Sequence, residues 1–287
     1  LSAEIMTSCA GTRLRALLRT AAAQQQCVMM PGALNGLLGQ AIGKQGFDAC
    51  YVSGAGVSAA SGLPDVGLIG VQDFCRVIRE VARSSGLPLI ADADTGFGEG
   101  EMVVRAAVEY AEAGAAGFHL EDQVFPKRCG HLAGKECVDA EQFAEKISRA
   151  AWARDHRLGG GFIVCARTDA RATHGVDEAI RRAKLYVDAG ADMVFPEGMQ
   201  SEDEFAAVAD ALRGYGGGGG SGARAQGRAL APCGGPFLLA NMTEFGVSPL
   251  LPAERLGQMG YHCVIFPVSV MRVMLAAATR ALGQIKR

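Results

Sequence analysis

Short runs of apolar residues recur along the chain and alternate with segments of helical periodicity. Continuous apolar runs of this kind are typical of strands buried on both faces of a parallel sheet. Glu101–Ala113 is an example of the predicted helices between the strands. Val104 and Val108 share one helical face, and Gly114, a residue typical of helix ends, directly follows the segment. The predicted strands are Cys27–Ala33, Ala49–Gly54, Leu87–Asp94, Gly117–Asp122, Phe162–Ala170, Met193–Gly198, Pro236–Met242 and Cys263–Ser269.

One supersecondary unit repeats along this pattern. The helices predicted over Glu101–Ala113 and Val176–Ala189 both run into an Ala-Gly-Ala sequence that leads to the next strand. Eight strand-helix units in about 250 residues have the size of a TIM barrel. An open doubly wound sheet is the alternative, but no G-x-G-x-x-G loop follows the first strand. We predict an α/β fold: a single (β/α)8 TIM-type barrel domain over residues 1–287, preceded by an N-terminal helix.

Two segments stand outside the repeat. Residues 215–228 are rich in Gly and Ser, a composition that buries too little apolar surface to order itself. We interpret them as a flexible surface insertion, with partner docking as the alternative. Residues 13–19 interleave arginines with leucines. They fit either the remnant of a targeting peptide or an amphipathic helix with its leucines on one face.

Composition narrows the class of protein. The chain has 287 residues, 49% of them hydrophobic, a net charge of −2 and a pI near 6.3, so nothing suggests a nucleic-acid partner. No apolar run approaches the roughly 20 residues of a membrane-spanning helix. The nine cysteines include no C-x-x-C pair, which argues against a disulfide framework or structural zinc. We therefore expect a reducing compartment: the cytoplasm of a bacterium or the mitochondrial matrix of a eukaryote.

Polar side chains gather where the predicted strands end. In a TIM barrel the active site lies at the carboxyl ends of the strands, so these residues are expected to converge. Any one of them could instead cap a helix or support a neighbour. They are Tyr51, Ser53, Asp92, Asp94, Glu121, Arg167, Asp169, Glu197, Asn241, Thr243 and Arg272.

The pair Asp92 and Asp94 predicts a divalent cation. Residues at i and i+2 of a strand point to the same side, and two adjacent carboxylates repel unless a proton or cation separates them. A few hard oxygen ligands suit Mg²⁺, or Mn²⁺, which completes its shell with water and substrate. The alternative is an ordinary strand-to-loop boundary where aspartates turn the chain.

A cysteine in a basic loop is the candidate reactive group. Cys129 follows Lys127 and Arg128 and precedes Gly130 and His131. Nearby positive charge lowers the pKa of a thiol, so a functional cysteine is expected in such surroundings. The alternative is a cysteine that merely packs in a basic loop.

Together these motifs resemble the isocitrate lyase and phosphoenolpyruvate mutase superfamily, over about residues 13–284. The Lys-Arg-Cys-Gly-His run is typical of its lyase branch, because mutases and oxaloacetate decarboxylase-like members usually lack that cysteine. The segments that carry the resemblance are Tyr51–Gly56, Gly62–Asp65, Asp92–Asp94, Glu121–Gln123, Lys127–His131, Ala166–Asp169, Phe195–Glu197 and Ala240–Gly246.

The resemblance implies Mg²⁺-assisted cleavage of 2-methylisocitrate to succinate and pyruvate, a retro-aldol or Claisen-type step of propionate catabolism in the 2-methylcitrate cycle. It implies Tyr51 as base, Cys129 as general acid, His131 as support for the cysteine loop, and Glu121 beside the metal, directly or through water. Arg167 is expected to stabilise the developing charge. The implied substrate-binding residues are Ser53, Gly54, Ala55, Cys129, Gly130, Arg167, Glu197, Asn241, Thr243 and Arg272.

Other functions stay open on the sequence. Isocitrate lyase activity differs by one methyl group, for which Phe195 and Ile265 would form an apolar pocket, and one methyl is worth only about 1–3 kcal/mol. A member acting on phosphonopyruvate or oxaloacetate is a further alternative, and a non-catalytic barrel scaffold is the least favoured. The resemblance also implies a homo-oligomer, a tetramer or a dimer.

Overall fold

The computed structural model describes residues 9–128, 130, 134–216, 231–232 and 234–287. Eight parallel strands form one sheet in the order β1-β8-β7-β6-β5-β4-β3-β2, and a bridge between Gly32 and Tyr51 brings its two edges together. The predicted TIM-type barrel is therefore confirmed. Its strands are β1 (Val28–Pro31), β2 (Cys50–Val52), β3 (Leu89–Asp92), β4 (Gly117–Glu121), β5 (Ile163–Thr168), β6 (Met193–Pro196), β7 (Phe237–Asn241) and β8 (Cys263–Phe266).

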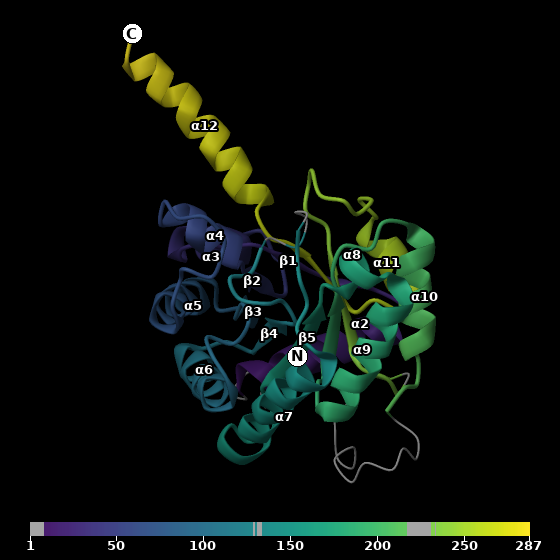
Figure 1. Cartoon of the computed structure of the whole chain (residues 1–287). Coiled ribbons are helices and arrows are strands. Elements are labelled where there is room, and N and C mark those ends of the chain that lie inside the picture. Colours follow the sequence, from purple (N-terminus) through teal and green to yellow (C-terminus); the bar gives the residue numbers. More distant parts are fainter. Residues whose placement is uncertain (1–8, 129, 131–133, 217–230, 233) are drawn as a thin grey trace.

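Helices surround the strands (Figure 1). The two helices expected from the repeat occur as α6 and α9, each followed by a glycine with positive φ, Gly114 and Gly190. The described helices are α2 (Ala10–Ala23), α3 (Gly36–Lys44), α4 (Gly54–Ala60), α5 (Val71–Ser85), α6 (Gly100–Ala113), α7 (Ala140–Arg157), α8 (Ala170–His174), α9 (Val176–Ala189), α10 (Glu202–Leu212), α11 (Ala253–Met259) and α12 (Ser269–Ile285).

Of the two interpretations of the N-terminal segment, the structure agrees with the amphipathic helix. Leu14 and Leu18 of α2 are fully buried with barrel-interior residues such as Ile163. Arg15 is buried as well, and its guanidinium donates to the carbonyl of Phe162 at 2.9 Å and pairs with Asp192 at 2.9 Å. Both polar and apolar contacts thus hold α2 against the N-terminal end of the barrel.

The last helix, α12, leaves the barrel instead of covering it (Figure 1). None of its residues is buried, and Val273, Leu275, Leu282 and Ile285 are 65–81% exposed. In a TIM barrel the helix after the eighth strand normally packs on the barrel wall. Here a groove is open beside β1, lined by residues of α2, β1 and α11 and by the segment after α3, including Met29 and Phe47.

Three expectations concern other parts of the chain. The predicted Gly-rich insertion lies almost wholly outside the described residues, in a connection from α10 to β7. The seven described cysteines are free of disulfides, as expected from their spacing. Among the helices that the structure describes, none combines the length and apolar character that crossing a membrane requires.

Candidate active site

The predicted polar residues converge on one pocket of about 310 Å³ at the carboxyl ends of the strands. Gly54, Asp94 and Glu121 lie directly behind its wall, in contact with lining residues. Cys129 and His131 are outside the described residues. The pocket is lined by Tyr51, Ser53, Ala55, Asp65, Asp92, Lys127, Gly130, Arg167, Phe195, Glu197, Asn241, Thr243, Glu244, Phe245, Gly246, Ile265, Pro267, Val268, Met271 and Arg272.

The two aspartates are neighbours, but the strand alternation that we predicted does not bring them together. The strand β3 ends at Asp92, and Asp94 has a φ of 44°, so strand alternation does not align them. The carboxylate of Asp92 instead accepts the N–H of Asp94 and the N–H of Gly54, each at 3.0 Å. A Cβ on Gly54 would lie 2.7 Å from Asp92 Oδ2 and 3.4 Å from Asp94 Oδ1. Only glycine therefore fits between the helix α4 and this acidic pair.

A buried lysine neutralises part of this charge. Lys127 Nζ lies 2.7 Å from Asp94 Oδ1 and 2.5 Å from Asp65 Oδ1. Burial alone would lower the pKa of Lys127, but the carboxylates around it, Glu121 and Asp92 foremost, hold that pKa above its ordinary value. Burial and the charge of Asp92 raise the pKa of Asp94 to about 6. Lys127 and Asp65 were not among the predicted site residues, although both lie in motifs that the sequence singled out.

Arg167 is held among three carboxylates. Its guanidinium lies 3.0 Å from Glu121 Oε2 and 2.9 Å from Asp169 Oδ2, and its NH2 atom lies 3.7 Å from Glu197 Oε2. Desolvation disfavours its charge, but these carboxylates outweigh that effect and raise the pKa of Arg167 well above its ordinary value. Arg167 is thus a fixed, permanently charged group in the pocket.

Gly130 packs directly on this arginine. A Cβ at Gly130 would lie 2.5 Å from Arg167 NH2 and 2.6 Å from Glu197 Cγ, so no other residue fits without displacement. The buried Lys135 donates to the carbonyl of Gly130 and pairs with Asp169 at 2.7 Å. The loop that contains the predicted Lys-Arg-Cys-Gly-His motif is therefore anchored in the pocket on both sides of Cys129, by Lys127 and by Gly130.

His119 was missed by the sequence analysis. It is fully buried in β4, and its Nε2 lies 2.7 Å from the hydroxyl of Tyr51, with Nδ1 3.7 Å from Asp92 Oδ1. Burial lowers the pKa of His119 to about 4 and raises that of Tyr51. A signal existed: His119 and Glu121 are the alternate polar residues of an otherwise apolar strand, and the period of two places them on one face.

The acidic cluster fits a magnesium ion. Oε1 of Glu121 is buried without a hydrogen-bond partner among the described residues, and Asp92 and Asp94 offer hard oxygen donors. Within the described part of the chain, no three acidic, histidine or cysteine side chains are arranged to enclose a metal by themselves. A cation here would bind few protein ligands and complete its coordination shell with water and substrate, as Mg²⁺ usually does.

The remaining predicted residues form the rim. Asn241 donates to Glu197 Oε2 at 3.1 Å. Arg272, at the start of α12, pairs with Glu244 at 3.0 Å and lies 5.2 Å above the ring of Phe245. The apolar part of the wall consists of Phe195, Ile265, Pro267, Val268 and Met271. The pocket thus combines cations, amide donors and an apolar face, as binding a branched polycarboxylate requires.

Comparison with known proteins gives consistent matches. The family model for phosphoenolpyruvate phosphomutase matches residues 18–286. The chain is 43% identical to a probable 2-methylisocitrate lyase of Corynebacterium glutamicum, over 96% of this chain and 82% of that protein. It is 39% identical to the 2-methylisocitrate lyase of Bacillus subtilis, over 90% of this chain and 77% of that protein. A crystal structure of 2,3-dimethylmalate lyase superposes with a TM-score of 0.85 at 36% identity, covering 98% of this chain and 86% of that one.

Proposed function

Because the chain belongs to the phosphoenolpyruvate phosphomutase family, we propose that it is a carbon–carbon lyase that cleaves 2-methylisocitrate into succinate and pyruvate. The observation that carries this proposal is the packing of Gly130 against Arg167 and Glu197, in the pocket that also contains Asp92. This packing supports the proposal, because Gly130, which follows Cys129 in the chain, lines the pocket beside the cationic Arg167 that suits a carboxylate-bearing fragment. Such a reaction would serve propionate catabolism through the 2-methylcitrate cycle.

The first step is loss of the substrate hydroxyl proton. A divalent cation held by Asp92 and Asp94, with Glu121 nearby, would lower the pKa of that hydroxyl. The Tyr51 oxygen accepts the proton while its own proton moves to His119 Nε2, 2.7 Å away. Burial lowers the pKa of His119 to about 4, so its ring is neutral near pH 7 and is a weak acceptor. His119 therefore holds this proton only transiently and releases it to solvent as the products leave.

The second step breaks the carbon–carbon bond. The bonding electron pair stays on the carbon that becomes a methylene of succinate, and pyruvate forms on the other side. The negative charge then spreads into the adjacent carboxylate. Arg167 is preorganised to stabilise it, since Asp169 and Glu121 fix its guanidinium before the substrate arrives.

The third step is protonation of the carbanion. Cys129, as a thiol, gives its proton to the carbon, and the thiolate is reprotonated from solvent after product release. The cations Lys127 and Arg128, which directly precede this residue in the sequence, make that exchange feasible near neutral pH.

The choice of substrate rests on the apolar wall. Phe195 and Ile265 are buried in the pocket and suit the methyl group that distinguishes 2-methylisocitrate from isocitrate. The second candidate is cleavage of 2,3-dimethylmalate, which the similarity to the 2,3-dimethylmalate lyase structure favours. Arg272 and Thr243 argue for the tricarboxylate, because the pocket offers polar groups for a third carboxylate.

A steady-state assay of 2-oxo acid formation with all three compounds tests the assignment. We expect kcat/KM to be highest for 2-methylisocitrate and about 10-fold or more lower for isocitrate, on the scale of one buried methyl group. A higher kcat/KM for 2,3-dimethylmalate would transfer the assignment to the second candidate. No 2-oxo acid from any of them would refute the lyase proposal.

We also propose that the active protein is a homo-oligomer in which α12 packs on a second copy. The support is that Leu275, Leu282 and Ile285 are exposed along one side of α12, while the groove beside β1 is open. A helix with such a wholly exposed apolar side gains free energy by covering it. Because Arg272 and Met271 of α12 line the pocket, docking this helix would also fix one wall of the active site.

A further inference from the structure

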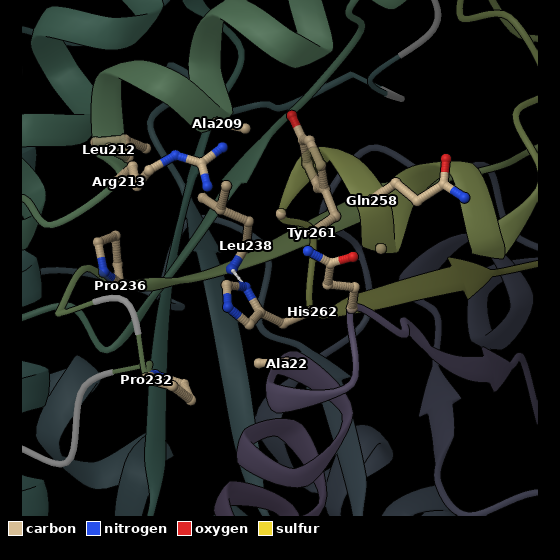
Figure 2. Close-up of a pocket in the computed structure, with 13 residues that line it drawn as sticks. Ala22, Ala209, Leu212, Arg213, Pro232, Pro236, Leu238, Gln258, Tyr261 and His262 are labelled. Carbon is tan, nitrogen blue, oxygen red and sulfur yellow. Dashed lines mark hydrogen bonds between the residues drawn. The ribbon is translucent and has the colours of Figure 1, made fainter.

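A second cavity lies at the opposite end of the barrel from the active site (Figure 2). It has a volume of about 150 Å³ and lies between α2, α10 and α11, where β7 and β8 begin. β7 connects the two ends: Leu238 lines this cavity, and Asn241 lines the active-site pocket three residues later. The cavity is therefore separate from the active site, and the proposed reaction makes no use of it.

His262 presents a hydrogen-bond donor to this cavity. Its Nδ1 accepts the N–H of Leu238 at 2.9 Å, which puts the ring proton on Nε2 when the ring is neutral. Burial lowers the pKa of His262 to about 4, so the ring is neutral near pH 7. The side chain is almost wholly buried, and Nε2 faces the cavity without a hydrogen-bond partner among the described residues (Figure 2). This N–H can therefore donate a hydrogen bond to an acceptor inside the cavity.

Arg213 supplies positive charge on the side of the cavity opposite His262. It follows α10, and its guanidinium extends toward Leu238 and Tyr261 (Figure 2). Its partner Asp210, 3.1 Å away, is an exposed residue, and an ion pair between such exposed side chains is weak. Of the described residues that line the cavity, none is acidic. The rest of its wall is mixed, because Gln25, Gln258 and Tyr261 line it together with the apolar residues Ala22, Ala209, Leu212, Pro232, Pro236 and Leu238.

We propose that this cavity binds a short monocarboxylate, with the carboxylate between His262 Nε2–H and Arg213 and the apolar end against Leu212 and Pro236. The volume has room for about five non-hydrogen atoms, if each occupies roughly the 30 Å³ of a water molecule in the liquid. Propionate has this size. A neutral amide of the same shape lacks the charge that Arg213 recognises, and a dicarboxylate would place a second charge against the apolar wall.

The test is histidine NMR on the full chain, labelled with ¹⁵N in its imidazoles and titrated with propionate at constant ionic strength. We expect a saturable shift of the His262 Nε2 signal with propionate and none with propionamide. The signal is assigned with His262→Asn, whose amide oxygen can still accept the Leu238 N–H. No saturable shift would mean that the cavity holds only water, and equal shifts with the acid and the amide would mean that it does not recognise the charge. Either result would overturn the proposal.

Two variants make the test specific to this cavity. Arg213→Gln should weaken propionate binding about 10-fold, the usual effect of losing a charge-assisted hydrogen bond. The matched control is Arg76→Gln, which removes another exposed arginine with an acidic partner on its own helix and should bind like the unchanged chain. Ala22→Met, at the rim of the cavity, should abolish the shift by filling the space. Equal affinity of the two arginine variants would contradict the assignment of Arg213.

Discussion

The ammonium group of Lys127 lies 2.7 Å from the Oδ1 atom of Asp94, and both side chains are more than nine-tenths buried. The same ammonium reaches Asp65, so one lysine connects the loop after α4, the turn after β3 and the loop after β4. A metal ion bound by Asp94 would share this carboxylate with Lys127. The two cations are therefore expected to oppose one another.

Replacing Lys127 should strengthen metal binding. In Lys127→Met, the positive charge beside Asp94 is gone, and at an effective dielectric constant near 20 its repulsion of a dication a few ångströms away exceeds 1 kcal/mol. We expect the Mn²⁺ dissociation constant, measured by electron paramagnetic resonance, to fall about 10-fold or more. Lys44→Met, at an exposed helix end, serves as the control and should leave the Mn²⁺ dissociation constant unchanged. Weaker binding in Lys127→Met would show that the lysine organises the site instead of competing for it.

Metal affinity should also depend on pH through Asp94. Burial and the Asp92 charge raise its pKa to about 6, and only the deprotonated carboxylate binds a cation. Mn²⁺ affinity should be nearly constant above pH 7 and fall as the pH drops through 6, approaching about 10-fold per pH unit below it. Asp94→Asn should have weak affinity with a much flatter profile. A profile in the unchanged chain that is flat from pH 7 to 5 would refute this role of Asp94.

Removing the Tyr51 hydroxyl should abolish most turnover without unfolding the barrel. Tyr51→Phe loses the 2.7 Å contact with His119 but keeps the ring that packs in the barrel interior. We expect kcat to fall about 10²–10⁴-fold, the usual contribution of a positioned proton acceptor. Tyr261→Phe, which loses a buried hydroxyl contact on the far side of the barrel, is the control for stability. A kcat within a few-fold of the unchanged enzyme would exclude Tyr51 as the acceptor.

Cys129→Ser should retain the fold and lose turnover. A serine hydroxyl is a far weaker acid than a thiol, so kcat is expected to fall about 10²–10⁴-fold while substrate binding persists. Cys137→Ser is the matched control in the same loop, because burial raises the pKa of that thiol to about 12 and makes it a poor acid. Comparable activity of the two variants would leave Cys129 without a catalytic role.

Assembly should depend on the apolar side of α12. Leu275 and Leu282 are both 65% exposed and lie two helical turns apart on one face. Leu275→Glu with Leu282→Glu should lower the molar mass measured by light scattering to that of one chain. Arg280→Glu places the same charge on the opposite side of the helix and should preserve the assembly. If the unchanged protein is already a single chain, the proposed packing of α12 is wrong.

The strands were predictable from sequence and several site details were not. Buried parallel strands are apolar along their whole length, so the runs that contain β1 to β8 stand out without any tertiary information. The polar residues at their ends, such as Arg167 and Glu197, could be grouped because a barrel brings all carboxyl ends to one face. This part of the prediction followed from topology.

The missed features depend on tertiary contacts. The φ of 44° at Asp94 accompanies a local hydrogen bond from its N–H to Asp92, but the space beside this pair is left by Gly54 of another element, which the local sequence does not specify. Lys127 comes from a loop, and only the folded chain places it beside Asp65. The exposure of α12 could not be predicted because an apolar helical face has the same pattern whether it packs on its own barrel or on another chain.

Product analysis by NMR after cleavage of 2-methylisocitrate in D2O tests the central claim most directly. The account predicts equal amounts of pyruvate and succinate, with one deuterium on a methylene carbon of succinate, because the proton that Cys129 delivers exchanges with solvent. It also predicts that the reaction slows about 10²–10⁴-fold in Cys129→Ser under the same conditions. Unchanged 2-methylisocitrate, or products in which the carbon–carbon bond is intact, would contradict it.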